Sequence, residues 1–178
     1  MASIIIRDAL LSDIDICQQI ERNAAKRFLQ SDDAQIRAVV KNSPILDIET
    51  LAKSVEHELC FISEISQEAV GFIALKQFEQ SWYIEELSVV EHAQSRGVGS
   101  GLLAYIKMLA EIRRIASINL ITFKDVAWNM PFYASKGYKQ MLTERLSTQF
   151  LNLWHEDNAV FDADLRICMQ LKIDIDKF

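Results

Sequence analysis

The first third of the chain combines a short β-branched run with apolar residues at helical spacing. The run Ile4–Ile6 predicts a first strand. Apolar residues then recur every three to four positions and predict a helix over 13–29. Asp47 is placed to cap a second helix over 48–57, whereas residues 30–46 show no clear period and stay unassigned.

The middle of the chain reads as consecutive strands. Residues 59–65 and 69–77 flank a polar turn at 66–68, which predicts a hairpin. Gly71 inside the second of these strands indicates a bulge. A third strand is expected over 82–90, where apolar residues are interrupted by two acids.

The last part returns to alternating helices and strands. A glycine-rich turn opens a helix that extends to Ile115. After it we expect a strand at 118–123, a short helix at 129–136 closed by Gly137, an extended segment at 138–142 and a last strand at 165–173. Residues 146–158 are ambiguous. Consecutive strands followed by a strand–helix–strand crossover predict an α/β fold with a mixed sheet, in one domain over 1–178.

Composition narrows the class of protein. The chain has 178 residues, a formal charge of −6 and 50% hydrophobic residues, typical of a globular domain. It shows no basic stripe for nucleic acid, no apolar run of the roughly 18 residues that span a membrane, and no signal peptide at its start. Cys17, Cys60 and Cys168 are odd in number and far apart, so we interpret them as reduced core thiols of a cytoplasmic protein, and we expect no metal site.

Glycine is the informative residue. Three of the five glycines, Gly97, Gly99 and Gly101, fall within five positions between a strand and a helix. Glycines let a ligand approach the backbone, and the first amides of a helix bind anions, most naturally a phosphate. Arg96 adds a positive charge at the edge of this turn. The alternative is a tight turn without a ligand.

Two common nucleotide motifs do not fit. A P-loop needs Gly-Lys-Ser/Thr, but Ser100-Gly101-Leu102 follows the second glycine. A dinucleotide fingerprint has the spacing Gly-x-Gly-x-x-Gly directly after its strand, and here the spacing is Gly-x-Gly-x-Gly.

The segment Gln94-x-x-Gly97-x-Gly99 after Leu87-Ser88-Val89 resembles the pyrophosphate-binding signature of the GNAT superfamily of acetyl-CoA-dependent N-acyltransferases. Residues 122–133, with the following Lys136-Gly137-Tyr138, resemble the second conserved block of that superfamily. The resemblance implies a GNAT-like fold, with a mostly antiparallel central sheet flanked by helices and a β–α–β core that binds acyl-CoA.

The resemblance also implies positions for the cosubstrate, acetyl-CoA. The backbone of three residues would pair with the pantetheine arm, and the turn amides would hold the pyrophosphate. Asn129 and Tyr133 would lie near the thioester. The residues so assigned to cosubstrate binding are Leu87, Ser88, Val89, Arg96, Gly97, Val98, Gly99, Ser100, Gly101 and Asn129.

Two adjacent acids are candidates for the chemistry. Acetyl transfer to an amine needs a neutral nucleophile, and Glu85 and Glu86 are acids within an otherwise apolar strand, where burial is costly unless they are used or solvated. Neighbouring strand residues point to opposite faces, so the two cannot act as a pair on one face. The resemblance places the base at Glu85 and leaves Glu86 as a substrate-facing or structural acid. The alternative is that both lie at a solvated strand edge.

The resemblance places the acid that protonates the departing thiol at Tyr133, although a Phe-Tyr pair on a short helix also fits core packing. Trp128 is a candidate for the acceptor pocket. The three cysteines have no basic partner in a recognisable arrangement, which argues against a route through a cysteine.

We therefore expect an N-acetyltransferase that moves an acetyl group from acetyl-CoA to a primary amine by direct attack within a ternary complex. The acceptor is a small molecule or a protein amino group, with no nucleic acid or membrane as partner, and a homodimer stays open. Two alternatives remain: a non-catalytic acyl-CoA-binding regulatory module, and an interaction domain whose glycine turn is empty.

Overall fold

The computed structural model describes residues 3–126 and 128–175, and the chain divides into two compact units. The first unit comprises Met1–Lys76 and Ile84–Ile106, and the second comprises Gln77–Tyr83 and Lys107–Phe178. Each unit is described by itself below. A single domain over 1–178 stays a prediction.

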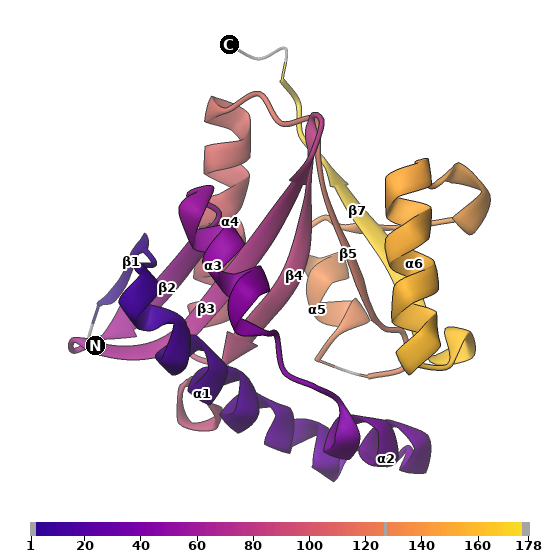
Figure 1. The fold of residues 1–178 in the computed structure, drawn as a ribbon, viewed down its shortest axis with the longest axis horizontal. Helices are drawn as coiled ribbons and strands as arrows, with labels where there is room; N and C mark the ends of the chain where they lie inside the picture. The colour runs from indigo at the N-terminus through magenta and orange to yellow at the C-terminus, as the bar shows by residue number, and fades with distance from the viewer. Residues whose placement is uncertain (1–2, 127, 176–178) are drawn as a thin grey trace. The chain divides into compact units, whose positions relative to one another are not determined.

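The strands follow the predicted order closely (Figure 1). They are β1 (Ile4–Asp8), β2 (Cys60–Ile65), β3 (Glu68–Phe78), β4 (Ser81–Val89), β5 (Ser117–Phe123), β6 (Lys139–Met141) and β7 (Arg166–Lys172). The helices are α1 (Ile14–Ala25), α2 (Ala34–Asn42), α3 (Ile48–Glu56), α4 (Val98–Ile112), α5 (Met130–Ser135) and α6 (Thr148–Val160).

The strands hydrogen-bond in the order β1-β2-β3-β4-β5-β7-β6. β1 with β2, β2 with β3, β5 with β7 and β6 with β7 are antiparallel, whereas β4 and β5 are parallel and are joined through α4. The predicted α/β fold is confirmed: a mixed, mostly antiparallel sheet with a β–α–β crossover.

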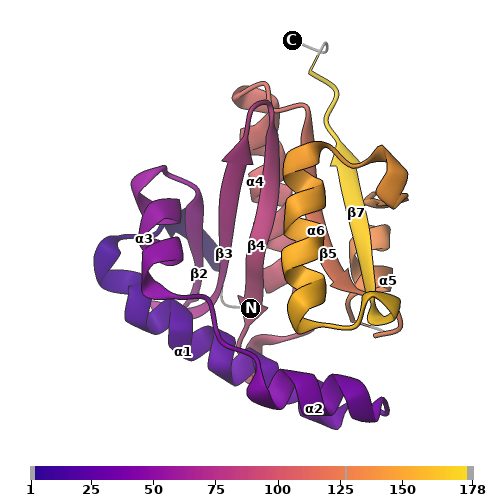
Figure 2. The same ribbon diagram turned by 45° about the vertical axis from the view of Figure 1, so that its right-hand side comes forward.

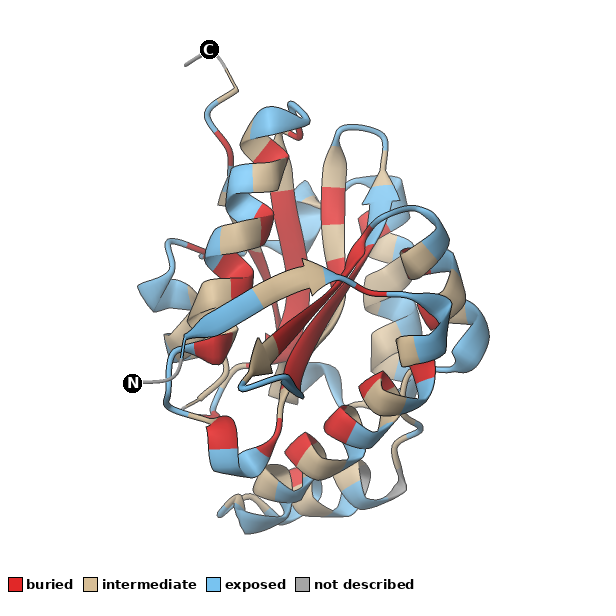
Figure 3. Ribbon diagram, turned by 90° about the vertical axis from the view of Figure 1, so that its left-hand side faces the viewer, coloured by how far each residue is buried: buried red, intermediate tan, exposed pale blue. Residues whose placement is uncertain are grey.

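In the first unit, side-chain alternation along β2 separates two packing faces. Cys60 faces the thiol of Cys17 on α1, and the next residue, Phe61, makes an edge-on contact with Tyr105 of α4 at 5.2 Å between ring centroids. Because successive strand residues point to opposite faces, α1 and α4 cover opposite sides of β2. α3 lies over β2 beside α1 (Figure 2), and the strands between the helices are largely buried (Figure 3).

The thiols of Cys17 and Cys60 form a buried pair between α1 and β2. Each residue is 1% exposed and neither is in a disulfide. The neighbouring Cys17 thiol and burial together raise the pKa of Cys60 well above the ordinary range of a cysteine. Cys168, in the second unit, is also a free and buried thiol, so the prediction of reduced core cysteines is confirmed.

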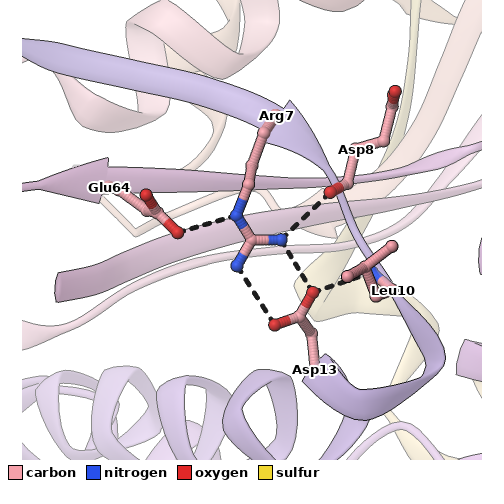
Figure 4. Close-up of polar contacts among 5 residues, drawn as sticks. All are labelled: Arg7, Asp8, Leu10, Asp13 and Glu64. Carbon is pink, nitrogen blue, oxygen red and sulfur yellow. Dashed lines mark hydrogen bonds and ion pairs between the residues drawn. The ribbon is translucent and has the colours of Figure 1, made fainter. Parts of the chain in front are cut away.

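A charged network fastens the end of β1 to the start of α1 (Figure 4). Arg7 donates from Nε to Glu64 at 2.7 Å, and from Nη1 and Nη2 to the two carboxylate oxygens of Asp13 at 2.7 and 3.1 Å. Asp13 also accepts from the backbone N–H of Leu10 at 2.7 Å, and Arg7 Nη1 donates to the carbonyl of Asp8 at 3.0 Å. The hydrogen bonds from Arg7 lead the causes that hold the pKa of Asp13 below its ordinary value.

The second unit has its own apolar cluster. Ile121 of β5, Phe150 of α6 and Cys168 of β7 are buried against each other, and Tyr83 meets Phe150 edge-on at 5.7 Å. Arg166 lies over the ring of Phe123 at 4.4 Å and donates to both carboxylate oxygens of Asp157 at 2.8 Å. The unit therefore buries a charge that is fully paired and stacked.

Three local features refine the sequence analysis. The predicted helix over 13–29 changes to a 3-10 helix (η2) at Lys26–Gln30. The predicted bulge exists beside Gly71: Ser63 opposes Gly71 and Glu64 opposes Ala69, so Val70 is the extra residue. The two unassigned segments contain helices α2 and α6.

Candidate active site

The glycine turn lies in the first unit, between the end of β4 at Val89 and the start of α4 at Val98. Gly97 adopts φ +91°, a left-handed conformation that L side chains rarely take, and this reversal points the chain into the helix. Helical geometry leaves the N–H groups of Val98, Gly99 and Ser100 without acceptors inside α4. The sequence analysis assigns an anion to these amides and to the helix dipole, and that assignment stays a prediction.

Gly101 differs from its two partners. Its N–H donates to the carbonyl of Gly97 at 2.8 Å, so this amide is used by the helix itself. A Cβ built at Gly101 would lie 3.7 Å from Ile6 Cδ1, an ordinary contact. The turn amides available to an anion therefore end at Ser100, while the exposed Arg96 stands at the edge of the turn.

Gly71 explains how β3 passes the start of α4. A Cβ at this position would lie 2.9 Å from Val98 Cγ1 and 3.1 Å from the carbonyl oxygen of Ser88, distances that force neighbours to move. The glycine that marks the bulge thus also keeps the turn and the end of β4 in place.

The side chain of Gln94 fixes the connection between β4 and the turn. Its Nε2 donates to the carbonyl of Val89 at 2.9 Å, and its Oε1 accepts from Arg27 Nη1 at 2.9 Å. Nearby, the N–H of Glu91 donates to Asn23 Oδ1 at 2.8 Å. Two side chains from α1 and the 3-10 helix after it thus hold the segment that leads into the turn.

Glu85 on β4 meets a hydroxyl of α3. Ser54 Oγ lies 3.3 Å from Glu85 Oε2 and 3.2 Å from the carbonyl of Thr50, so its single proton serves one of two acceptors at a time. Burial raises the pKa of Glu85 above its ordinary value, while Lys76 and the Ser54 hydrogen bond act in the opposite direction. A half-buried carboxylate whose pKa is moved toward neutrality is suited to accept a proton.

Glu86 has different neighbours from Glu85. Ser88, which is 5% exposed, donates from Oγ to Glu86 Oε1 at 2.6 Å. The negative charge of Glu86 also acts on Glu21 of α1. The two adjacent glutamates therefore have different hydrogen-bond partners, which agrees with the expectation that they do not form a pair on one face.

Glu21 is a site residue that the sequence analysis missed. Burial first, and then the charge of Glu86, raise the pKa of its carboxyl to about 8. Both carboxylate oxygens accept from the backbone N–H of Leu46, at 3.0 and 3.1 Å. The available signal was its position next to the buried Ile20 on the same helix, where a carboxylate flanks the apolar stripe.

The remaining predicted residues lie in the second unit. Asn129 precedes α5 and donates from Nδ2 to Thr122 Oγ1 at 2.9 Å. Tyr133 meets the rings of Phe132 and Tyr138 edge-on at 5.3 and 5.7 Å. Trp128 is half-buried. Their roles toward thioester and acceptor stay predictions.

The structure thus groups the first-unit residues. Glu85, Glu86, the Leu87–Val89 segment and the glycine turn follow one another along β4 and into α4. A pocket of about 430 Å³ in the second unit, lined by 78–81, 116–117 and 147–149, holds none of the predicted site residues.

Residues 3–126 and 128–175 hold no group of three or more His, Cys, Asp or Glu placed to bind a metal ion. In the same residues no helix combines the length and apolar character needed to cross a membrane. His57, His92 and His155 are exposed.

Comparison with protein families identifies the central segment. Residues 56–140 match the model of an acetyltransferase (GNAT) domain, a range that includes β2 to β5, both glutamates of β4 and the whole glycine turn. The resemblance noted in the sequence is thereby confirmed.

Solved structures show the same fold at low sequence identity. A PaiA N-acetyltransferase from Thermoplasma acidophilum in complex with coenzyme A is 16% identical, with a TM-score of 0.72 over 96% of this chain and 99% of that one. The ribosomal-protein-S18-alanine N-acetyltransferase from Escherichia coli is 17% identical, with a TM-score of 0.68 over 97% and 95%. An N-acetylglutamate synthase from Neisseria gonorrhoeae with coenzyme A and N-acetyl-glutamate is 19% identical, with a TM-score of 0.74 over 98% of this chain and 36% of that one.

Proposed function

We propose that this chain, which carries a GNAT acetyltransferase domain over residues 56–140, transfers an acetyl group from acetyl-CoA to a primary amine by direct attack in a ternary complex. The observation that carries the proposal is the turn at Gly97, whose φ of +91° turns the amides of Val98, Gly99 and Ser100 into the start of α4 after β4. Coenzyme A in similar solved structures supports the choice of cosubstrate.

The residues of the turn fit a pyrophosphate. Three helix-start amides, a glycine backbone that allows close approach and the charge of Arg96 suit two linked phosphates. No acidic side chain occurs between Ala93 and Ala110 to oppose them. Leu87, Ser88 and Val89 are proposed to pair with the pantetheine arm through their backbone. Acetyl-CoA would supply the acetyl thioester.

The proton chemistry is assigned to side chains of this chain. An alkylamine has a pKa near 10.4, so at neutral pH its deprotonation costs roughly 4–5 kcal/mol. Glu85 is proposed to take that proton, directly or through one water, because burial raises its pKa toward the working range. Glu86 is proposed to face the acceptor amine. Tyr133 is proposed to protonate the departing sulfur and Asn129 to lie near the thioester, both on the strength of the resemblance.

The acceptor is proposed to be a primary amine of a small molecule or of a protein. Similar solved structures support both classes of acceptor. One is a ribosomal-protein-alanine N-acetyltransferase, and another is an N-acetylglutamate synthase with bound N-acetyl-glutamate. Trp128 is proposed to line the acceptor pocket.

Calorimetric titration with acetyl-CoA, with NADH as control ligand, tests the donor. We expect micromolar binding of acetyl-CoA alone, followed by CoA release in a screen of small amines and N-terminal peptides. Binding without turnover on any amine would favour the acyl-CoA-binding module. Absence of acetyl-CoA binding would overturn the proposed function.

The Tyr133→Phe variant separates an enzyme from a binding module. Removing the phenol hydroxyl should lower turnover on the order of ten-fold or more while acetyl-CoA affinity stays near wild type. An unchanged turnover would remove Tyr133 from the reaction, and lost acetyl-CoA affinity would assign it to binding.

A further inference from the structure

Helix α1 has polar side chains on both flanks of its buried stripe. Ile14, Cys17, Ile20 and Ala24 form the stripe that packs on the sheet of the first unit. At about 100° per residue, Gln18 and Glu21 fall on one flank of this stripe and Asn23 on the other, where the chain continues to Arg27. The two flanks contact different segments.

The Glu21 flank holds the connector between α2 and α3. Glu21 accepts from the N–H of Leu46 at 3.0 and 3.1 Å, and Gln18 Nε2 donates to the carbonyl of Leu46 at 3.0 Å. Both backbone groups of Leu46 are therefore bound by α1. The next residue, Asp47, caps α3 by accepting from the N–H of Thr50 at 2.8 Å.

The helix that Asp47 caps also contacts the proposed base. It carries Ser54, whose hydroxyl oxygen lies 3.3 Å from Glu85 Oε2. The connector at Leu46 thus sets the start of the helix that covers Glu85. A change at Leu46 therefore reaches Glu85 on β4 through one short helix.

The opposite flank holds the segment that leads into the glycine turn. Asn23 Oδ1 accepts from the N–H of Glu91 at 2.8 Å, and Arg27 Nη1 donates to Gln94 Oε1 at 2.9 Å. Gln94 in turn donates to the carbonyl of Val89 at 2.9 Å. The side chain of Gln94 therefore connects Arg27 to the end of β4, directly before the turn.

We propose that Arg27 is a positioning residue that acts through Gln94, so that α1 and the 3-10 helix after it link the cosubstrate turn to the connector at Leu46 and thereby to the helix whose Ser54 lies beside Glu85. The inference rests on the proposed function, because the ligand of the turn is acetyl-CoA. A ligand that orders the turn also orders α1 through these contacts. The connector becomes more ordered in turn, because Gln18 and Glu21 of α1 bind both backbone groups of Leu46. Linkage makes the effect reciprocal: acetyl-CoA favours the ordered connector, and an ordered connector favours acetyl-CoA.

Hydrogen exchange of the full chain with and without saturating acetyl-CoA tests the link. In the wild type, acetyl-CoA should slow amide exchange in peptides covering 43–56 as well as in those covering the turn. In Arg27→Met, at a concentration that still saturates the variant, exchange should slow at the turn only. Acetyl-CoA affinity should fall about five-fold or more.

Two further variants isolate the contact. Lys26→Met removes the same charge one residue earlier, from an exposed side chain, and should keep both the affinity, within about two-fold, and the protection of 43–56. Gln94→Met breaks the contact from the other side and should reproduce Arg27→Met. It also provides the test if Arg27→Met fails to fold.

The outcomes are distinguishable. Wild type that fails to bind acetyl-CoA overturns the proposed function, and this inference with it. Wild type that binds but shows no protection of 43–56 overturns the inference alone. Full protection of 43–56 in a folded Arg27→Met, or Lys26→Met matching Arg27→Met, also overturns it.

Discussion

Two groups of charged side chains in the first unit are built in opposite ways. At the end of β1, Arg7 lies between Asp13 and Glu64 and contacts each at 2.7 Å (Figure 4). Along β4, Glu85 meets a serine hydroxyl, and beside that strand Glu21 accepts from a backbone N–H and is acted on by the charge of Glu86. In the first group the carboxylates are paired with a cation, whereas Glu85 and Glu21 accept hydrogen bonds from a hydroxyl and a backbone N–H.

The consequence shows in proton affinity. The pKa of Asp13 is lowered, chiefly by its hydrogen bonds to Arg7, whereas burial raises the pKa of Glu85 and raises that of Glu21 to about 8. The ion-paired network at Arg7 stabilises the fold, and the Asp13 carboxyl stays ionised near neutral pH. A buried carboxylate whose pKa is raised costs stability when it is charged, and a raised pKa of this kind is a feature of catalytic carboxylates.

The largest expected effect tests the chemical side of this contrast. Glu85→Gln should lower kcat/KM for an amine acceptor on the order of 10²-fold or more, because the amide cannot accept the proton. The loss should be greatest at pH values below the acceptor's pKa. The wild-type rate should fall on the acid side at a pH above 4.5, the ordinary value, because burial raises the pKa of Glu85.

Glu56→Gln is the matched control for this change, because Glu56 is an exposed acid at the end of α3. It should leave the pH–rate profile unchanged. A Glu85→Gln enzyme with the wild-type acid limb would contradict the assignment of Glu85 as base.

The structural side of the contrast predicts a loss of stability without a loss of rate. Arg7→Met leaves Asp13 and Glu64 without their cation and should lower the free energy of unfolding by about 1–2 kcal/mol in a denaturant titration. Because the folded pKa of Asp13 is lowered, its contribution is present above 3.8 and disappears as the pH falls further. The free energies of unfolding of wild type and variant should therefore approach each other at low pH.

Lys53→Met breaks the exposed Lys53–Glu49 ion pair of α3 and is the comparison for Arg7→Met. It should change stability by less than about 0.5 kcal/mol, as exposed pairs do. Equal losses in both variants would mean that the network at Arg7 is worth no more than a surface pair.

The last effect has the opposite sign. The folded pKa of Glu21, about 8, lies above the ordinary 4.5, so the folded state holds more protons between these values and wild-type stability falls as pH rises through them. Glu21→Gln keeps an acceptor for Leu46 but has no charge to bury. It should be more stable than wild type by about 3–5 kcal/mol near pH 9, and the difference should shrink as the pH falls toward 5. Thermal unfolding at both pH values measures the difference, and a variant that is less stable at the higher pH would contradict it.

Local patterns were sufficient for most of the fold. Ile4–Ile6, the hairpin around 66–68 and the apolar run of β5 carry strand signals within a few residues, and the structure confirms them. Helices α2 and α6 were missed for a shared reason. Each has one buried apolar residue among the positions whose side chains are described, Ile36 and Phe150, so the apolar stripe of each helix is short.

The site was predictable only where it is local. The turn, Glu85 and Glu86 lie within 17 consecutive residues (85–101), and the family model covers them. Glu21 gave only the signal of a carboxylate beside an apolar stripe, because the groups that act on it are Leu46, 25 positions away, and Glu86 on β4. Arg27 and Asn23 likewise gain meaning only when α1 lies beside the segment after β4.

The buried thiols of Cys17 and Cys60 can report local unfolding of the first unit. A thiol whose pKa is raised by burial and by a neighbouring thiol does not react with alkylating reagents until α1 separates from β2. The rate of alkylation at these two positions therefore counts openings of the first unit. Mass spectrometry can follow it in unlabelled protein, without introducing any probe.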